Sequence, residues 1–113
     1  MFNFLSNKSN DMDITAEEFK EKMKELPGVV IDVRTRDEYG EGHLSITDEN
    51  YDLLNGDFHD AVEKLEKDKT YYLYCRSGNR SGQAARIMKN SGFDSVYNIG
   101  GFEDLANSGL ETE

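Results

Sequence analysis

The chain has 113 residues, which suits one compact domain, and its formal net charge is −10. Such an acidic surface repels nucleic acid and anionic membranes, so we expect neither as a partner. No apolar run approaches the roughly 20 residues that cross a membrane, and the first residues lack the basic flank of a secretory leader. We therefore expect a cytoplasmic protein, with a loosely ordered lead-in over residues 1–11 and one domain over residues 12–110.

Strand and helix patterns alternate from residue 12 onward. Residues 12–14 suit a short strand. The capping-box pattern Thr15–Glu18 predicts the start of a helix that ends at Pro27-Gly28. The unbroken β-branched run over residues 29–33 is typical of a strand buried on both faces, as in a parallel sheet.

The middle of the chain carries weaker patterns. Residues 35–39 suit one helical turn, and residues 43–47 are a candidate strand. Asn55-Gly56 suits a turn, with Asp57 as the N-cap of the helix that follows. We expect that helix to place the apolar residues of the segment 58–65 on one face.

The clearest strand of the second half covers residues 70–75 and is rich in aromatic side chains. A small, polar and basic segment over residues 76–81 predicts a loop, and the helix after it is expected to end near Gly92. A last strand over residues 95–99 stops at Gly100-Gly101, before a short final helix. This alternation implies an α/β domain with a mostly parallel sheet covered by helices.

Cys75 is the single cysteine of the chain, so an intramolecular disulfide is impossible. A zinc site would depend on His43, His59 and carboxylates that lack close spacing, so we expect no metal and no other cofactor. A lone cysteine is either a small buried apolar residue or a reactive thiol. Its neighbours favour the reactive thiol, because Cys75 lies where a parallel strand ends and a helix begins.

The segment after Cys75 suits an anion. Backbone amides of the following helix and of a glycine turn at Gly78 would stabilise a thiolate and lower the pKa of the thiol. From residue 75 to residue 93 there are basic residues and no acidic ones, in a chain that has 23 acidic residues. A small anionic substrate is therefore expected here, bound by Arg76 and Arg80. Two further cations, Arg86 and Lys89, suit an ordinary exposed helix face.

Two kinds of chemistry use a thiolate in such a loop, namely phosphate transfer and sulfur transfer. Phosphatases of the cysteine type need an arginine six positions after the cysteine, so that the loop wraps a tetrahedral phosphate. Here that position is Ser81, and Arg80 comes one residue earlier. The shorter loop favours one sulfur atom on Cys75, while a phosphatase or an arsenate reductase stays an alternative.

Three motifs, in this order, resemble the rhodanese family of sulfurtransferases, and the resemblance covers residues 12 to about 109. They are Asp32-Val33-Arg34 with Glu38-Tyr39 and Gly42-His43-Leu44, then the strand and loop from Tyr72 to Ser81, then Ile99-Gly100-Gly101-Phe102. Two departures stand out. Residues 45–49 occupy the place of a usual Gly-Ala pair, and Leu105 lies near the place of a usual tryptophan.

The resemblance implies a rhodanese-like α/β fold with a central, mostly parallel, five-stranded sheet and helices on both faces. It implies that Cys75 takes a sulfur atom from thiosulfate or a related donor, and passes it from a persulfide to a thiol or cyanide acceptor. The residues implied to form the cradle and bind the donor are Arg76, Ser77, Gly78, Asn79, Arg80 and Ser81. The residues expected to support the site through ion pairs and hydrogen bonds are Asp32, Arg34, Glu38 and His43.

Two alternatives stay open at this point. A direct Cys75–His43 dyad would give the thiol a base, although an amide cradle can activate a thiol without one. A non-catalytic persulfide carrier or partner-binding module would suit the acidic chain and its lack of a second cysteine.

Overall fold

The structure is a computed structural model and describes residues 12–113. The lead-in predicted over residues 1–11 lies outside the described residues. In chain order, the elements are α1 (Ala16–Glu25), β1 (Val29–Asp32), α2 (Arg36–Glu41), β2 (Glu49–Asn50), α3 (Asp57–Val62), β3 (Thr70–Cys75), α4 (Asn79–Asn90), β4 (Ser95–Gly101) and α5 (Phe102–Asn107).

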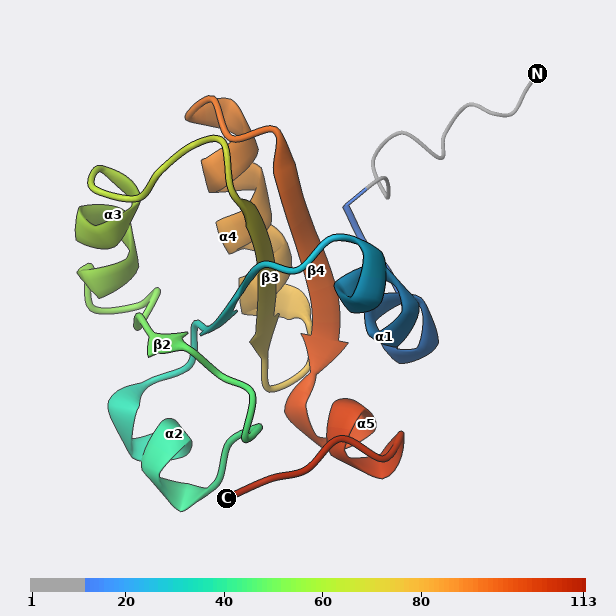
Figure 1. The fold of residues 1–113 in the computed structure, drawn as a ribbon. Helices are drawn as coiled ribbons and strands as arrows, with labels where there is room; N and C mark the ends of the chain where they lie inside the picture. Colours follow the sequence, from blue (N-terminus) through green and yellow to red (C-terminus); the bar gives the residue numbers. More distant parts are fainter. Residues whose placement is uncertain (1–11) are drawn as a thin grey trace.

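The sheet of the described residues is parallel and has four strands in the order β2-β1-β3-β4, so the prediction of five strands is wrong. The missing strand is the one expected over residues 12–14, where Asp13 forms only an isolated parallel bridge to Asn98. The pairing stops there because Thr15 immediately caps α1. In Figure 1, β3 and β4 point toward the side of the molecule where α2 and α5 lie.

The prediction of a strand over residues 43–47 is also wrong. Leu44 forms an isolated antiparallel bridge with Thr112, and the amide of Thr47 donates to the Leu44 carbonyl in a turn, at 3.0 Å. The parallel partner of β1 comes later, at β2. The strand that pairs with β1 begins only after this turn, because the chain must first return from the end of α2 to the open edge of β1.

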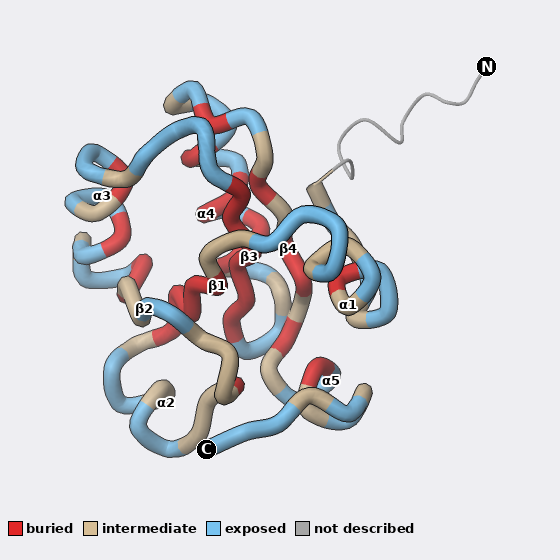
Figure 2. Tube along the Cα trace, viewed as in Figure 1, coloured by how far each residue is buried: buried red, intermediate tan, exposed pale blue. Residues whose placement is uncertain are grey.

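Helices cover both faces of the sheet, as predicted. The side chains of β3 alternate between two buried clusters, one shared with α3 and α4 and the other with α1 and α5. Tyr71, Leu73 and Cys75 belong to the first cluster, and Tyr72 and Tyr74 to the second. Figure 2 shows the buried chain concentrated along the central strands, with exposed segments on the surrounding helices. Burial on both faces explains why all of β3 is apolar or aromatic apart from its first residue, Thr70.

The helix boundaries follow local chemistry. Thr15 and Thr35 each form the capping box with a glutamate, which fixes the starts of α1 and α2. The prediction that Asp57 caps α3 is wrong, because Gly56 is the N-cap and Asp57 is the first helical residue. Within residues 12–113, no helix is long and apolar enough to cross a membrane.

Candidate functional site

Cys75 ends β3, and only residues 76–78 separate it from α4. The loop predicted over residues 76–81 is therefore shorter, because Asn79 to Ser81 already form the first turn of the helix. So tight a connection requires a left-handed residue, and Gly78 supplies it with φ 94°. This geometry directs the first amides of α4 back toward the end of β3.

Three donors surround the sulfur of Cys75. The amide of Gly78 lies 3.1 Å from Sγ, and the amide and hydroxyl of Ser81 each lie 3.3 Å from it. The cysteine is 0% exposed, so water does not compete with these donors at the sulfur. All three groups can donate to a thiolate, so together they form an anion cradle around Sγ.

Burial and hydrogen bonding act on the thiol in opposite directions. Burial raises the pKa of Cys75, and it is the largest single effect. The hydrogen bonds from Ser81, Ser77 and Gly78 act together against it and hold the pKa below its ordinary value. The fold therefore favours a thiolate that is shielded from solvent, which suits a nucleophile.

Glu38 links the loop to α2. Its carboxylate forms two hydrogen bonds with the guanidinium of Arg80, at 2.8 and 3.0 Å. Hydrogen bonding from Arg80 is the main reason that the pKa of Glu38 falls to about 2. Arg76 lies 3.7 Å from the same carboxylate, with its side chain 76% exposed. Of the two arginines beside the loop, Arg80 is thus already paired, whereas Arg76 extends into solvent.

A second ion pair lies where β1 ends. Arg34 binds Asp32 through contacts of 2.7 to 3.0 Å and donates to the carbonyl of Gly42 at 2.6 Å. Its guanidinium carbon also lies 4.6 Å from the centre of the Phe102 ring. The pair therefore joins the end of β1 to the end of α2 and the start of α5.

His43 lies apart from the cysteine contacts. Its Nδ1 lies 3.0 Å from the carbonyl of Tyr39, and its Nε2 lies 3.7 Å from Glu113. Its ring also stacks on that of Tyr39, with 3.8 Å between the centroids. Among the described residues, both ring nitrogens thus face groups other than Cys75, and this geometry gives no support to a Cys75–His43 dyad.

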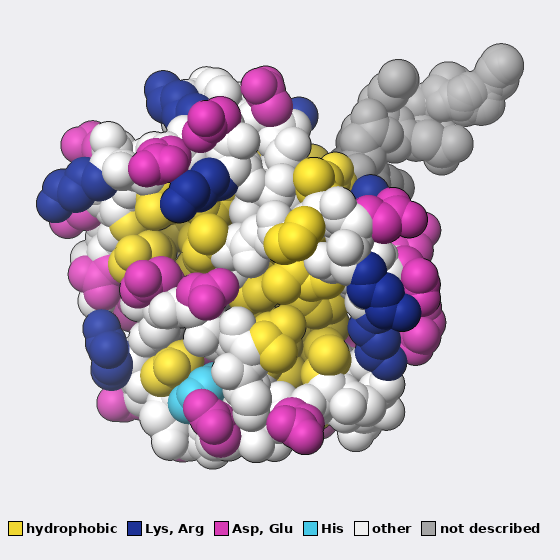
Figure 3. All heavy atoms as spheres, in the orientation of Figure 1, with side chains coloured by type: hydrophobic (Ala, Val, Ile, Leu, Met, Phe, Trp, Pro, Cys, Tyr) yellow, Lys and Arg dark blue, Asp and Glu magenta, His cyan; other side chains and the backbone are white. Residues whose placement is uncertain are grey.

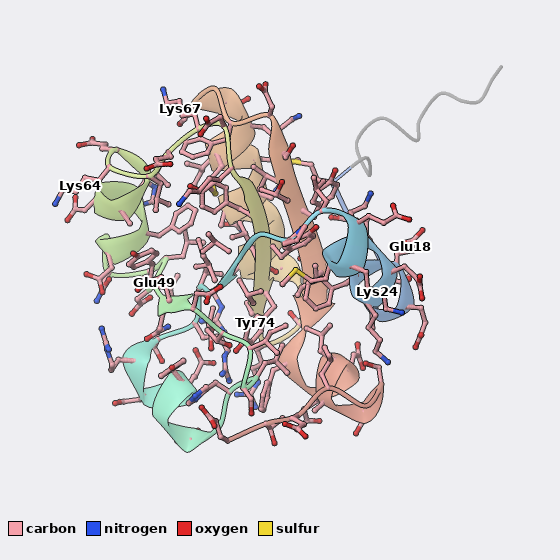
Figure 4. All side chains as sticks on the ribbon, viewed as in Figure 1. Glu18, Lys24, Glu49, Lys64, Lys67 and Tyr74 are labelled. Atoms are coloured by element: carbon pink, nitrogen blue, oxygen red, sulfur yellow. The ribbon has the colours of Figure 1, made fainter. Side chains whose placement is uncertain are left out.

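Tyr74 holds the segment that departs from the family pattern. Its hydroxyl accepts from the amide of Leu44 at 3.1 Å and lies 2.8 Å from Oγ1 of Thr47. Burial is the main cause that raises the pKa of Tyr74 to about 12, so the hydroxyl stays protonated at neutral pH. Figure 4 labels Tyr74 near the end of the sheet toward α2 and α5. The residue directly before Cys75 thus fixes the turn after Gly42.

A cleft of about 550 Å³ opens beside the loop, between α2 and the start of α5. It is lined by Arg34, Glu38, Glu41, Gly42, Arg76, Ser77, Phe102, Glu103 and Asp104. Carboxylates outnumber arginines in this lining, so the cleft is less positive than the cations after Cys75 alone would suggest. Among residues 12–113, no group of three His, Cys, Asp or Glu side chains is placed to hold a metal ion.

Asn98 belongs to the site but was missed by the sequence analysis. Its Oδ1 accepts from the Ser81 hydroxyl at 2.7 Å, and its Nδ2 donates to the carbonyl of Gly78 at 3.0 Å. The side chain is buried, and it contacts two of the residues that donate to Cys75. The only signal in the sequence is a polar residue between Tyr97 and Ile99 in the last strand.

The comparisons with known proteins agree with this geometry. The family model of the rhodanese-like domain matches residues 15–108. The chain is 32% identical over 94 residues to "Putative sulfur carrier protein YrkF" of Bacillus subtilis. This match covers 82% of this chain and 49% of that protein. It is 33% identical over 91 residues to the uncharacterized protein YqhL of the same organism, which covers 80% of this chain and 68% of that protein.

The chain thus spans about half the length of the first relative and about two thirds of the second. Among solved structures, it resembles a rhodanese-related protein from Thermoplasma volcanium, with a TM-score of 0.73 and 27% identity. That match covers 89% of this chain and 96% of the other. The fold is therefore shared over nearly the whole domain.

Proposed function

The chain belongs to the rhodanese-like family, and from that premise we propose that it is a sulfurtransferase in which Cys75 carries the transferred sulfur. The observation that carries this proposal is the enclosure of Sγ by the donors of Gly78 and Ser81 at 3.1 to 3.3 Å. They stabilise negative charge on a sulfur atom without a neighbouring base. A persulfide is also an anion near neutral pH and can use the same donors.

The proposed reaction has two steps. The Cys75 thiolate attacks the outer sulfur of thiosulfate, a new S–S bond forms, and sulfite leaves with the electron pair of the broken S–S bond. A thiolate or cyanide acceptor then attacks the outer sulfur of the persulfide. The Cys75–S bond breaks, the electron pair returns to Cys75 as a thiolate, and the acceptor leaves as a persulfide or as thiocyanate.

Arg76 is the side chain best placed to attract the anionic donor in this proposal. It lines the cleft and its side chain is 76% exposed, whereas Arg80 is held by Glu38. We assign Arg80, Ser77 and Asn79 to shaping the loop, and the amides of the loop to binding the sulfur. The ion pairs of Asp32, Arg34 and Glu38 would hold the loop in a fixed position beside the cleft.

Steady-state turnover of thiosulfate and cyanide to thiocyanate tests this function. We expect wild type to turn over and Cys75→Ser to lose all measurable turnover, because an alkoxide is not accessible at neutral pH. Arg76→Ala should raise KM for thiosulfate more than it lowers kcat. Full activity in Cys75→Ser, or hydrolysis of an aryl phosphate by wild type in place of sulfur transfer, would exclude the proposal.

A persulfide carrier that serves a protein acceptor is the second candidate. The observation that favours it is the relative named as a sulfur carrier, which matches over 82% of this chain. The acidic lining of the cleft also suits a cationic partner surface better than free thiosulfate. The turnover assay separates the two candidates, since a carrier would load one sulfur atom on Cys75 yet release it only slowly to cyanide.

A further inference from the structure

The buried amide of Asn98 joins separate parts of the sulfur cradle. Its Nδ2 donates to the carbonyl of Gly78 and to Oδ1 of Asp13, both at 3.0 Å. Its Oδ1 accepts from the Ser81 hydroxyl at 2.7 Å and from the amide of Gly100 at 3.1 Å. These four contacts fix which way the amide points, because each side of it has partners that the reverse orientation would lose.

The Ser81 hydroxyl has a single proton and two neighbours that can accept it. Its Oγ lies 3.3 Å from Sγ of Cys75 and 2.7 Å from Oδ1 of Asn98. When Cys75 is a thiol, the S–H can donate to Oγ while the hydroxyl donates to Asn98. When Cys75 is a thiolate or persulfide, a proton turned to sulfur leaves Oγ and Oδ1 2.7 Å apart without a hydrogen bond between them, so the Ser81–Asn98 bond itself favours the thiol. Support of the thiolate by Asn98 therefore has to come through the carbonyl of Gly78, whose amide donates to Sγ.

We propose that Asn98 is a positioning residue, which holds the Gly78 turn in the place where its amide can donate to the sulfur on Cys75. Asn98 does not touch the sulfur itself and acts through the carbonyl of Gly78. Gly82 makes room for it, since a Cβ at that position would lie 3.2 Å from Nδ2. Asp13 orients the amide from the other side, across the isolated bridge that joins it to Asn98.

The test measures the rate of Cys75 alkylation by iodoacetamide against pH, with intact mass as the readout. The chain has one cysteine, so the profile reports the pKa of that thiol alone. We expect Asn98→Leu to raise this pKa by about half a unit or more, the scale of one weakened hydrogen bond to a charged group. Asn90→Leu, the same change at the exposed end of α4, should leave it unchanged.

A double-mutant cycle with Ser81→Ala separates the Gly78 route from the Ser81 hydroxyl. If Asn98 acts through Gly78, the rise caused by Asn98→Leu should be at least as large when Ser81→Ala is already present, because that background has no hydroxyl proton for Asn98 to draw away from the sulfur. A rise that disappears with Ser81→Ala, no change in pKa, or a lower pKa in Asn98→Leu would each overturn the proposal. The nearby charged groups, namely Arg80 and Arg86 on α4, Asp13, and the Asp32–Arg34 pair, stay unchanged throughout this cycle.

Asp13 provides a second route if Asn98→Leu does not fold. Asp13→Asn keeps an oxygen for Nδ2 and removes the charge, whereas Asp13→Ala removes both. We expect a higher Cys75 pKa in Asp13→Ala than in Asp13→Asn, and equal values would contradict the proposal. Alkylation needs no sulfur donor, so this result stands apart from the proposed function. A changed pKa without sulfur transfer would refute only that function.

Discussion

Cys75 is a buried thiol whose pKa is nevertheless below its ordinary value. Removing water from the sulfur destabilises the thiolate, but the donors of Ser81, Ser77 and Gly78 more than offset this and lower the pKa of the thiol. The balance depends on donors held at 3.1 to 3.3 Å, so small movements of the loop change it. Residues that hold the loop therefore matter for reactivity even where they do not touch the sulfur.

Glu38 is such a residue, and its substitution gives a prediction about pH. Its pKa is lowered from 4.5 to about 2, mainly by hydrogen bonding to Arg80. A carboxylate with a depressed folded-state pKa contributes stability above its unfolded pKa, and this stability is lost as pH falls through the folded value. We therefore expect Glu38→Gln to be less stable than wild type at pH 7, with the difference closing between about pH 4.5 and pH 2.

Urea unfolding at several pH values measures this difference in free energy. Glu41→Gln is the matched control on the same helix, because Glu41 makes no ion pair among the described residues. It should show no comparable dependence on pH. A constant gap between Glu38→Gln and wild type over this range would contradict the assignment of the Glu38–Arg80 pair.

Among the elements, β4 makes a close backbone contact with the Cys75 loop. A Cβ at Gly101 would lie 2.5 Å from the carbonyl oxygen of Arg76 and 3.1 Å from Cα of Ser77. Both are backbone atoms, so no side chain can rotate away to make room. The end of β4 thus packs directly against the loop that shapes the sulfur cradle.

Gly101→Ala should consequently move the loop. We expect a loss of about 1–3 kcal/mol in stability, typical of overpacking, together with slower sulfur loading of Cys75. Gly40→Ala on α2 is the control, because a Cβ there meets nothing within 4 Å. It should raise stability by about 0.5–1 kcal/mol through helix propensity. Gly101→Ala with unchanged stability and loading would show that the loop does not depend on this contact.

For the molecule as a whole, the alternation of strand and helix was sufficient to predict the α/β class, and the β-branched run over residues 29–33 was sufficient to predict the burial of β1. The sequence pattern was not sufficient to predict which segments form the edge strands of the sheet. Residues 12–14 and 43–47 have strand-like composition, but a helix cap and a turn prevent them from forming ladders. These outcomes depend on neighbouring structure, and composition alone does not contain them.

Some contacts of the candidate site likewise follow from patterns in the sequence, and others do not. The cysteine and its loop form one short segment with a recognisable pattern, and Asp32, Arg34 and Glu38 lie in another. The hydrogen bonds between Arg80 and Glu38 bring the two segments together. The Ser81–Asn98 contact spans 17 positions and the Tyr74–Leu44 contact spans 30, and neither leaves a local pattern. The pairing of Glu38 with Arg80 likewise shows that a basic segment need not give a strongly positive cleft.

The net charge of the molecule agrees with a cleft that is not strongly positive. The net charge is −10, and the face drawn in Figure 3 carries acidic side chains around its edge. Negative charge over the surface keeps anions away unless a local site attracts them. In the proposed function, attraction of an anionic sulfur donor would thus depend on the loop amides and Arg76 more than on the surface as a whole.

Carriage of sulfur by Cys75 is the central claim, and intact mass spectrometry after incubation with thiosulfate tests it most directly. We expect wild type to gain the mass of one sulfur atom, to lose it again on addition of cyanide, and Cys75→Ser to gain nothing. A wild-type protein that acquires no adduct, or a Cys75→Ser protein that acquires the same one, would contradict the account.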